Sequence, residues 1–409
     1  MKIAIVNLVA RTVLVDNPTN ILSAFSLPRP RIETDEDSNI VQLGLELTRL
    51  GNEVTIYASD AFLPARSIGN SQKGLSTRYL PTRLTRLFPY AYYPFTPTLH
   101  RELLDNEYDI VQSGEFFQLG TIISAFASSK GNFPCIVWHE LGVQQNFPAN
   151  LIEESYCRTL GKLIEKKVRF FIPRSYAARD WLVGKGVPEP KIGCVLHSGA
   201  NMRMFYPMKN TPQLKTRFGV PEDSVLIASV ARLHPYRRLD HVIMALRLLA
   251  NRCSQVYLII AGDGPQADYL NDLIAKINLQ KHVRLVGRLS KRRLNELYNA
   301  CDFTVLAGKK GLFPSFSIAE SLTCGKPVIH SSPGGERDLG GDGFASFYVK
   351  YGDIRALAEK MLLLIENPEI CNRMGKNALE LARKEYILET VARKFLNAYR
   401  ACIEEPFKS

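Results

Sequence analysis

Short runs of apolar residues alternate with longer amphipathic stretches along most of this 409-residue chain. Residues 2–9 form the first apolar run, and residues 38–50 follow with apolar side chains at helical spacing, ended by Gly51. Continuous apolar strands separated by helices are typical of a parallel sheet covered on both faces. The alternation therefore predicts an α/β fold of doubly wound, Rossmann-like sheets. We expect residues 2–9 to be the first strand, since this run is short and lacks a signal-peptide cleavage site.

The alternation restarts after residue 200, which predicts a second unit of the same kind. Further strands are expected at residues 225–230, 256–261, 303–306 and 327–330, with helices between them. A chain of this length is also too long for one ordinary core. We therefore expect two Rossmann-like domains, joined near residues 201–211.

The net charge of +12 limits the partners that this chain can meet. A basic surface attracts nucleic acid, anionic lipid or anionic small substrates. The cations stand in short groups such as Lys291-Arg292-Arg293, and no long basic tail carries them. This distribution favours phosphate pockets and a membrane-facing surface, and we expect no nucleic-acid partner. For any single group, a solvated helix face is the other interpretation.

The spacing of the cysteines indicates the cellular compartment of the protein. None of the eight belongs to a CxxC or other paired spacing, and several stand in apolar runs such as residues 134–137. They are expected to be reduced core residues of a cytoplasmic protein, without disulfides or zinc. No stretch approaches the length of a membrane-spanning helix, so we expect any membrane association to be peripheral, on the inner face.

Two arginines follow the first strand expected in the second half. Open parallel sheets bind ligands at the carboxyl ends of their strands. Arg232 and Arg237 stand there, and two guanidinium groups can clamp a diphosphate with paired hydrogen bonds. The alternative is a pair of surface arginines.

A glycine pattern follows the next strand. The segment Gly262-x-Gly264-x-x-Ala267 matches the fingerprint of dinucleotide-binding loops. The strand after it ends at Gly287 without the acidic residue that would hold a ribose, which disfavours a nicotinamide-dependent oxidoreductase. We expect instead a tight turn at Gly262 whose backbone comes close to a ligand.

The third loop opens a helix with small and hydroxyl residues. Ser315, Phe316 and Ser317 stand at this helix start, where unpaired backbone N–H groups can face an anion. Glu320 lies about one turn further in, and its carboxylate can accept hydrogen bonds from two neighbouring hydroxyls, as a ribose presents. Taken alone, Glu320 is also compatible with a surface helix position.

These stretches together resemble the group 1 glycosyltransferases (glycosyltransferase family 4, retaining, B-type fold). The stretches that carry the resemblance are residues 192–207, 229–238, 261–265, 320–329 and 334–335. The resemblance implies two Rossmann-like domains facing a central cleft. It places an acceptor-side domain at residues 1–203, a nucleotide-sugar-binding domain at 204–383, and a C-terminal helix at 384–409 that packs back on the first domain.

The resemblance also implies an activity. It is the transfer of a hexose-type sugar from a nucleotide-diphosphate donor to a hydroxyl of a glycan, glycolipid or lipid-linked acceptor, as in cell-envelope glycan biosynthesis. The resemblance implies that the transfer retains the anomeric configuration and requires neither a metal nor a cofactor. By position, Arg232 and Arg237 would neutralise the diphosphate, and Glu320 would hold the ribose. His139 would lie beside the transferred sugar, with a loop or core histidine as the alternative, and Arg288 would lie near the base. The base, the sugar and the acceptor are not determined by the sequence.

Three positions depart from the family pattern. The family has two glutamates eight positions apart, and the first falls on Leu312, so a sugar-nucleotide-binding relative without turnover is the alternative function. The family's lysine falls on Arg237. Residues 34–39 replace a glycine-rich loop, and the Asp-x-Asp within them is interpreted as part of a solvated loop and not as a metal motif.

Residues 78–101 interleave arginines with aromatic residues and prolines, which argue against one continuous helix. Two interpretations are open. The rings can pack inward as a core loop, or the rings and cations can face an anionic membrane surface together.

Overall fold

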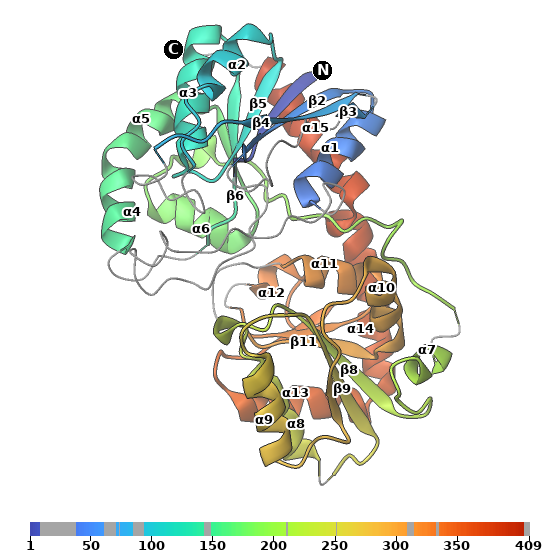
Figure 1. Ribbon diagram of the computed structural model, residues 1–409. Coiled ribbons are helices and arrows are strands. Elements are labelled where there is room, and N and C mark those ends of the chain that lie inside the picture. The colour runs from blue at the N-terminus through green and yellow to red at the C-terminus, as the bar shows by residue number, and fades with distance from the viewer. Residues whose placement is uncertain are drawn as a thin grey trace. The chain divides into compact units, whose positions relative to one another are not determined.

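The computed structural model describes residues 1–8, 38–60, 71–72, 74–84, 94–142, 149–209, 212–250, 252–308, 315–332 and 335–404. The chain divides into two compact units (Figure 1). The first comprises Met1–Arg174, Ala178–Leu196 and Val391–Ser409, and the second comprises Ser175–Ala177 and His197–Thr390.

In its described part, the first unit holds a seven-stranded sheet of order β3-β4-β2-β1-β5-β6-β7. The strands are β1 (Lys2–Val6), β2 (Glu53–Ser59), β3 (Ser71–Gln72), β4 (Leu75–Leu80), β5 (Ile110–Gly114), β6 (Cys135–His139) and β7 (Phe170–Pro173). All neighbours pair in parallel except β3, which runs antiparallel to β4 at the edge. The chain starts at β1, builds outward through β2, and returns to the other side at β5. This reversal creates a switch point between β1 and β5.

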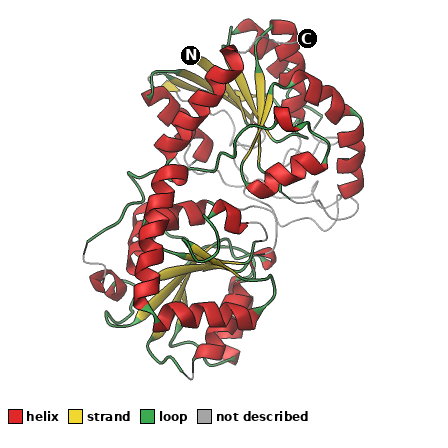
Figure 2. Ribbon diagram, turned by 180° about the vertical axis from the view of Figure 1, so that it is seen from behind, coloured by secondary structure: helices red, strands yellow, loops and turns green. Residues whose placement is uncertain are grey.

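Helices cover both faces of this sheet (Figure 2). They are α1 (Asn39–Arg49), α2 (Leu99–Asp105), α3 (Leu119–Gly131), α4 (Ala149–Arg158), α5 (Leu160–Lys167), most of α6 (Tyr176–Gly184) and α15 (Leu388–Glu404) from Val391 onward. Phe395 of α15 packs edge-on against Trp138 of β6, with ring centroids 5.2 Å apart. Tyr399, one turn later, donates a hydrogen bond to Gln112 of β5, so this part of α15 belongs to the core of the first unit.

The described part of the second unit holds a six-stranded sheet of order β10-β9-β8-β11-β12-β13, and its neighbouring strands pair in parallel. The strands are β8 (Val225–Val230), β9 (Val256–Ala261), β10 (Val283–Leu285), β11 (Phe303–Leu306), β12 (Val328–His330) and β13 (Ser346–Tyr348). The helical segments are α7 (Pro212–Thr216), η5 (Pro235–Arg237), α8 (Leu239–Leu249), α9 (Ala267–Lys276), α10 (Lys291–Ala300), α11 (Phe316–Thr323), α12 (Gly335–Asp338), α13 (Ile354–Glu366), α14 (Pro368–Leu381) and the π turn η6 (Ala382–Tyr386). The order reverses between β8 and β11. Both units are therefore doubly wound α/β folds, which confirms the predicted fold class.

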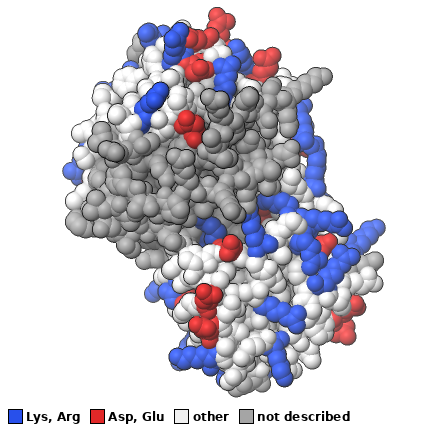
Figure 3. All heavy atoms as spheres, viewed as in Figure 1, with Lys and Arg blue, Asp and Glu red and all other residues white. Residues whose placement is uncertain are grey.

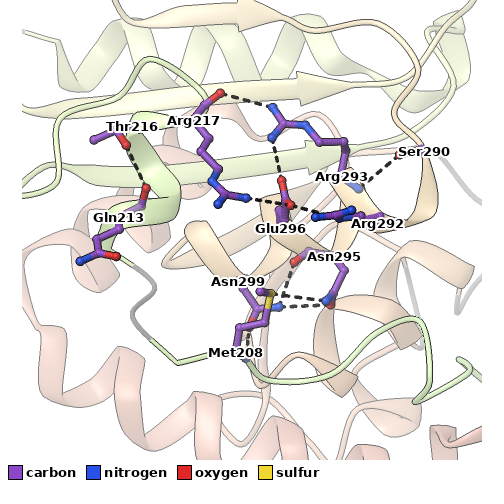
Figure 4. Close-up of polar contacts among 10 residues, drawn as sticks. All are labelled: Met208, Gln213, Thr216, Arg217, Ser290, Arg292, Arg293, Asn295, Glu296 and Asn299. Atoms are coloured by element: carbon purple, nitrogen blue, oxygen red, sulfur yellow. Dashed lines mark hydrogen bonds and ion pairs between the residues drawn. The ribbon is translucent and has the colours of Figure 1, made fainter.

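The segment that enters the second unit is fixed to α10 (Figure 4). The backbone N–H of Tyr206 donates to Asn295, and that of Met208 donates to Asn299. Two asparagines one turn apart on α10 thus accept hydrogen bonds from two backbone N–H groups of this segment. The buried carboxylate of Glu296, on the same helix, pairs with Arg217 at 3.0 Å and Arg293 at 2.6 Å.

Candidate functional site

The switch point of the second unit lies between the carboxyl ends of β8 and β11. At such a point the loops after the two strands diverge to opposite faces and leave a crevice for a ligand. The loop after β8 holds Arg232 and Arg237, and the loop after β11 leads to α11. Candidate residues far apart in the sequence therefore follow strands that are neighbours in the sheet.

Tyr236 joins the two predicted arginines. Arg232 donates a hydrogen bond to the Tyr236 hydroxyl at 2.7 Å. The guanidinium carbons of Arg232 and Arg237 lie 5.9 Å and 5.1 Å from the centre of its ring, within range of a cation–π interaction. The structure thus gathers two cations around one aromatic ring.

Arg237 also lies next to the loop after β11. A Cβ atom added to Gly308 would stand 3.5 Å from the Arg237 Cα atom. The Nε atom of Arg237 is buried without a hydrogen-bond partner, and within the described ranges no carboxylate pairs with its side chain. Arg238, the next residue, is different, because Asp240 binds it through both carboxylate oxygens, at 3.0 and 2.8 Å.

The glycine loop after β9 supports the arginine loop. Gly262 has φ +151°, and a Cβ atom there would stand 1.8 Å from the carbonyl oxygen of Ala231. Gly264 has φ +154°, and its Cβ would stand 2.5 Å from the carbonyl oxygen of Leu233. The close approach that these glycines permit is therefore to the backbone on either side of Arg232. The predicted approach of Gly262 to a ligand stays a prediction.

Arg288 is exposed and follows Gly287 in the loop after β10. The carbonyl of Gly287 accepts a hydrogen bond from the N–H of Gly262 at 2.9 Å. This bond ties the loop that carries Arg288 to the glycine loop.

Helix α11 begins with the predicted residues. Its N-cap is Ser315, whose hydroxyl lies 2.8 Å from that of Ser317, and Phe316 is its first residue. The hydroxyl of Ser315 makes no capping hydrogen bond to the backbone. Leu312, and with it the question of the replaced glutamate, lies outside the described residues.

Glu320 is buried, contrary to a surface helix position. Its Oε2 accepts a hydrogen bond from the buried hydroxyl of Tyr298 at 2.9 Å, and its Oε1 lies 3.5 Å from Lys291 Nζ. Burial raises the pKa of the carboxyl, while Lys291 and Tyr298 oppose this rise. Lys291 and Tyr298 come from α10, and sequence reasoning did not identify either as part of the site.

The cations of the second unit are partly neutralised. Figure 3 shows Lys and Arg side chains gathered on this unit where Figure 1 places α10. The basic group that opens α10 is engaged, since Lys291 faces Glu320 and Arg293 pairs with Glu296. The solvated-face interpretation of this group therefore does not describe all of its members.

His139 lies in the first unit, at the carboxyl end of β6, and its side chain is fully buried. Its ring stacks at a tilt on Trp181, with centroids 4.7 Å apart, and meets Phe117 edge-on. Its Nδ1 lies 3.0 Å from Glu115 Oε2. Glu115 was missed by sequence reasoning, although a carboxylate directly after a central strand was a signal that could have identified it.

Glu140, next to His139, carries a partly buried carboxylate, with 33% of its side chain exposed. Burial raises the pKa of its carboxyl, and the paired guanidinium of Arg174 opposes this rise. Arg174 also lies over the Trp138 ring, 5.1 Å from its centre. This partly buried carboxylate therefore has a cationic partner close to the histidine.

Residues 78–101 do not form one unit of structure. Residues 78–80 end β4, and residues 99–101 begin α2. Arg78 pairs with Glu102 at 2.7 Å, Arg101 pairs with Asp105 at 3.1 Å, and Arg83 is exposed. Residues 85–93, which hold most of the aromatic rings, lie outside the described part, as do residues 34–37.

The described residues contain neither a candidate membrane-spanning helix nor a candidate metal-binding group. None of the helices there is long and apolar enough to cross a membrane. No group of three or more His, Cys, Asp or Glu in the same ranges is arranged to hold a metal ion.

Residues 210–381 match the sequence family described as glycosyl transferases group 1. This part of the chain is a group 1 glycosyl transferase domain. The domain contains the arginine loop, the glycine loop and α11, so the match covers all the site residues predicted in the second unit. The predicted roles of the single residues stay predictions.

Relatives of the group 1 domain carry transferase and synthase names. EpsD of Bacillus subtilis, a putative glycosyltransferase, is 26% identical over 208 residues, which are 50% of this chain and 54% of that protein. The trehalose synthase of Pyrococcus horikoshii is 28% identical over 189 residues, which are 44% of this chain and 45% of that protein. The chain thus spans about half the length of these relatives.

Solved structures extend the likeness to both units. Anabaena HepE in complex with UDP has a TM-score of 0.72 at 16% identity, over 98% of this chain and 100% of that chain. Sucrose-phosphate synthase from Thermosynechococcus elongatus has a TM-score of 0.73 at 18% identity, over 98% of each chain. At such low identity the likeness concerns the fold alone, and it confirms the expected B-type fold.

Proposed function

We propose that this chain is a retaining glycosyltransferase that moves a hexose-type sugar from a nucleotide-diphosphate donor to a hydroxyl of a glycan, glycolipid or lipid-linked acceptor. The observation that carries the proposal is the arginine loop at the switch point. Arg232 and Arg237 meet at Tyr236 beside the loop after β11, and no carboxylate in the described residues pairs with Arg237. The UDP bound to Anabaena HepE, which shares this fold, supports a nucleoside diphosphate as the ligand.

The proposed chemistry is electrostatic. Breaking the sugar–phosphate bond places negative charge on the departing diphosphate. The two guanidinium groups and the N-terminal N–H groups of α11 would stabilise this charge where it develops, and no metal or cofactor would be required. With retention, the acceptor hydroxyl attacks from the face that the nucleotide leaves.

Glu320 would bind the ribose. Tyr298 donates to its Oε2, whereas the polar contact that its Oε1 makes among the described residues is the longer one with Lys291. A carboxylate can accept several hydrogen bonds, so a pair of ribose hydroxyls can be bound at Oε1 without displacing Tyr298. Arg288 would lie near the base, and His139 beside the sugar.

Product analysis tests this function. The protein is incubated with UDP-, GDP- and ADP-sugars and a mixture of envelope glycans and glycolipids, and release of nucleoside diphosphate and a new glycosidic product are followed together. The proposal predicts both products for at least one donor. Donor binding without turnover would favour a sugar-nucleotide-binding relative, the alternative that the replacement at Leu312 raises.

For the acceptor, we propose a lipid-linked molecule at the inner face of the membrane. The cytoplasmic protein would bind this membrane surface through residues 78–101. Arg78, Arg83 and Arg101 are all exposed in the structure. Arg78 and Arg101 are in ion pairs, whereas Arg83 pairs with no carboxylate of the described residues. Each cation near anionic lipid contributes about 1 kcal/mol. Co-sedimentation with anionic vesicles should weaken for Arg83→Glu and with added salt. Arg252→Glu, a matched reversal in the second unit, should bind as wild type does, and absence of binding at low salt would favour a soluble acceptor.

A further inference from the structure

Glu115 adopts a backbone conformation that is unusual for its residue type. Its φ is +46°, in the left-handed region that favours glycine. Its neighbours hold it there, since Thr121 donates to its carbonyl at 2.7 Å and its own N–H donates to the Trp138 carbonyl at 3.2 Å. A strained residue fixed by several bonds at the end of a central strand is typical of functional sites.

The sheet brings Glu115 to His139. In the register of β5 and β6, Gly114 lies opposite Trp138, so the next residues of the two strands are neighbours. The two carboxylate oxygens of Glu115 have different surroundings. Oε1 accepts the backbone N–H of Glu140 at 3.0 Å, and Oε2 lies 3.0 Å from His139 Nδ1.

Two groups of opposite character face Nδ1 of His139. The backbone N–H of Phe116, a donor, lies at 3.4 Å, and the carboxylate of Glu115, an acceptor, lies at 3.0 Å. An unprotonated Nδ1 would direct its lone pair toward a charged oxygen at the shorter of these distances. The carboxylate therefore favours the tautomer with its proton on Nδ1.

The other ring nitrogen then carries the lone pair. Nε2 of His139 is buried and has no hydrogen-bond partner among the described residues. Such unsatisfied buried atoms are rare in folded proteins and call for a partner that the protein itself does not supply. Trp181 and Phe117 pack against the ring and limit its rotation.

We propose that Glu115 is a positioning residue that keeps the proton of His139 on Nδ1, so that Nε2 accepts a hydrogen bond from a hydroxyl of the bound sugar. The inference rests on the proposed function, because it takes His139 to lie beside the transferred sugar. Glu115 itself does not touch the substrate. It acts only through the tautomer and the orientation of the imidazole.

Nuclear magnetic resonance of the full-length, histidine-labelled protein at pH 8 tests the tautomer directly. The chain has seven histidines, and the loss of one set of signals in His139→Gln identifies the relevant ring. We expect the proton on Nδ1 in the wild type. In Glu115→Gln, the side-chain oxygen keeps the Glu140 N–H, so the amide NH₂ faces Nδ1 and the proton moves to Nε2. A proton on Nε2 in the wild type, an imidazolium, or the same tautomer in both proteins would overturn the proposal.

A second variant guards against misfolding of the first. Glu115→Ala leaves the Phe116 N–H as the group that faces Nδ1 of His139. In this variant, too, His139 should therefore carry its proton on Nε2. Kinetics then link the tautomer to activity. Glu115→Gln should lower kcat about tenfold, as loss of one good hydrogen bond does, and leave the donor KM nearly unchanged. Glu189→Gln, at an exposed ion pair with Arg179 in the same unit, should leave kcat unchanged.

The two readouts separate failure of this inference from failure of the proposed function. If the wild type consumes no nucleotide sugar, the proposed function fails, and the tautomer comparison still tests the effect of Glu115 on His139. If the tautomer changes while kcat stays at the wild-type value, the positioning role is wrong and the transferase function stands.

Discussion

The buried hydroxyl of Tyr298 donates a 2.9 Å hydrogen bond to Glu320, and this bond links α10 to α11. Tyr298 itself packs edge-on against Phe205, with ring centroids 5.9 Å apart. One carboxylate oxygen is therefore oriented by the protein before any ligand binds. A pre-oriented carboxylate loses less freedom when it accepts a ribose hydroxyl, which favours binding.

Glu320→Gln should stabilise the folded protein in a pH-dependent way. Because burial raises the pKa of this carboxyl above its usual 4.5, the charged form destabilises the folded state at pH values above the folded pKa. Glutamine removes this cost and can still accept the Tyr298 hydrogen bond. We expect Glu320→Gln to have a larger free energy of unfolding than wild type at pH 7. This difference between the two proteins should close as the pH falls toward 4.5.

Urea unfolding at several pH values measures this difference. Glu189→Gln is the control, because Glu189 belongs to an exposed ion pair and such pairs contribute only about 0–1 kcal/mol. The difference in free energy of unfolding between this variant and wild type should stay small at every pH. A Glu320→Gln variant less stable than wild type at pH 7 would show that Lys291 outweighs desolvation.

Arg232→Ala should impair the chemical step. Loss of one charge-stabilising donor typically costs about 2–4 kcal/mol of transition-state stabilisation, measured as kcat/KM. Arg238→Gly is the matched control in the same loop. Arg238 has φ +47° and is neutralised by Asp240, so glycine should be tolerated there with little change in activity. An Arg232→Ala protein that is folded and fully active would exclude Arg232 from the diphosphate clamp.

Gly262→Ala should disturb the arginine loop, and Gly287→Ala should not. The added Cβ at Gly262 would stand 1.8 Å from the Ala231 carbonyl oxygen, so the backbone beside Arg232 must move. We expect a loss of about 2 kcal/mol or more in stability, together with weaker nucleotide binding. Gly287 has φ +66° and nothing within 4 Å of an added Cβ, so only the backbone strain of about 1 kcal/mol remains. Thermal unfolding and nucleotide titration of the two variants decide this, and equal effects would contradict the supporting role of Gly262.

The fold was predictable where the strands are continuous apolar runs. Residues 225–230 and 256–261 were expected as strands and are β8 and β9. Strand β4 was missed because its sequence, LSTRYL, mixes polar and apolar residues near the edge of the sheet. In the C-terminal region, Asn367 separates α13 from α14, and the π turn η6 separates α14 from α15. Directly after η6 ends, Ile387 pairs with Ala200, a contact that local periodicity cannot reveal.

The proximity of candidate site residues was predictable where they are local in sequence. Arg232 and Arg237 meet because Tyr236 stands between them in one short loop. Glu115 and His139 are 24 positions apart and meet only through the register of β5 and β6. Lys291 and Tyr298 lie on α10 and contact Glu320 on α11. Helix propensity alone does not specify which residues of two helices will touch.

Isothermal titration calorimetry with UDP, GDP and ADP tests the central claim, that the second unit binds the nucleoside diphosphate of the donor. Wild type should bind at least one of them. Glu320→Ala should weaken this binding by about 1.5–3 kcal/mol, as loss of one partner in a charged hydrogen bond typically does, even though no sugar is attached. No binding of any of the three, or equal affinity for wild type and Glu320→Ala, would contradict the account.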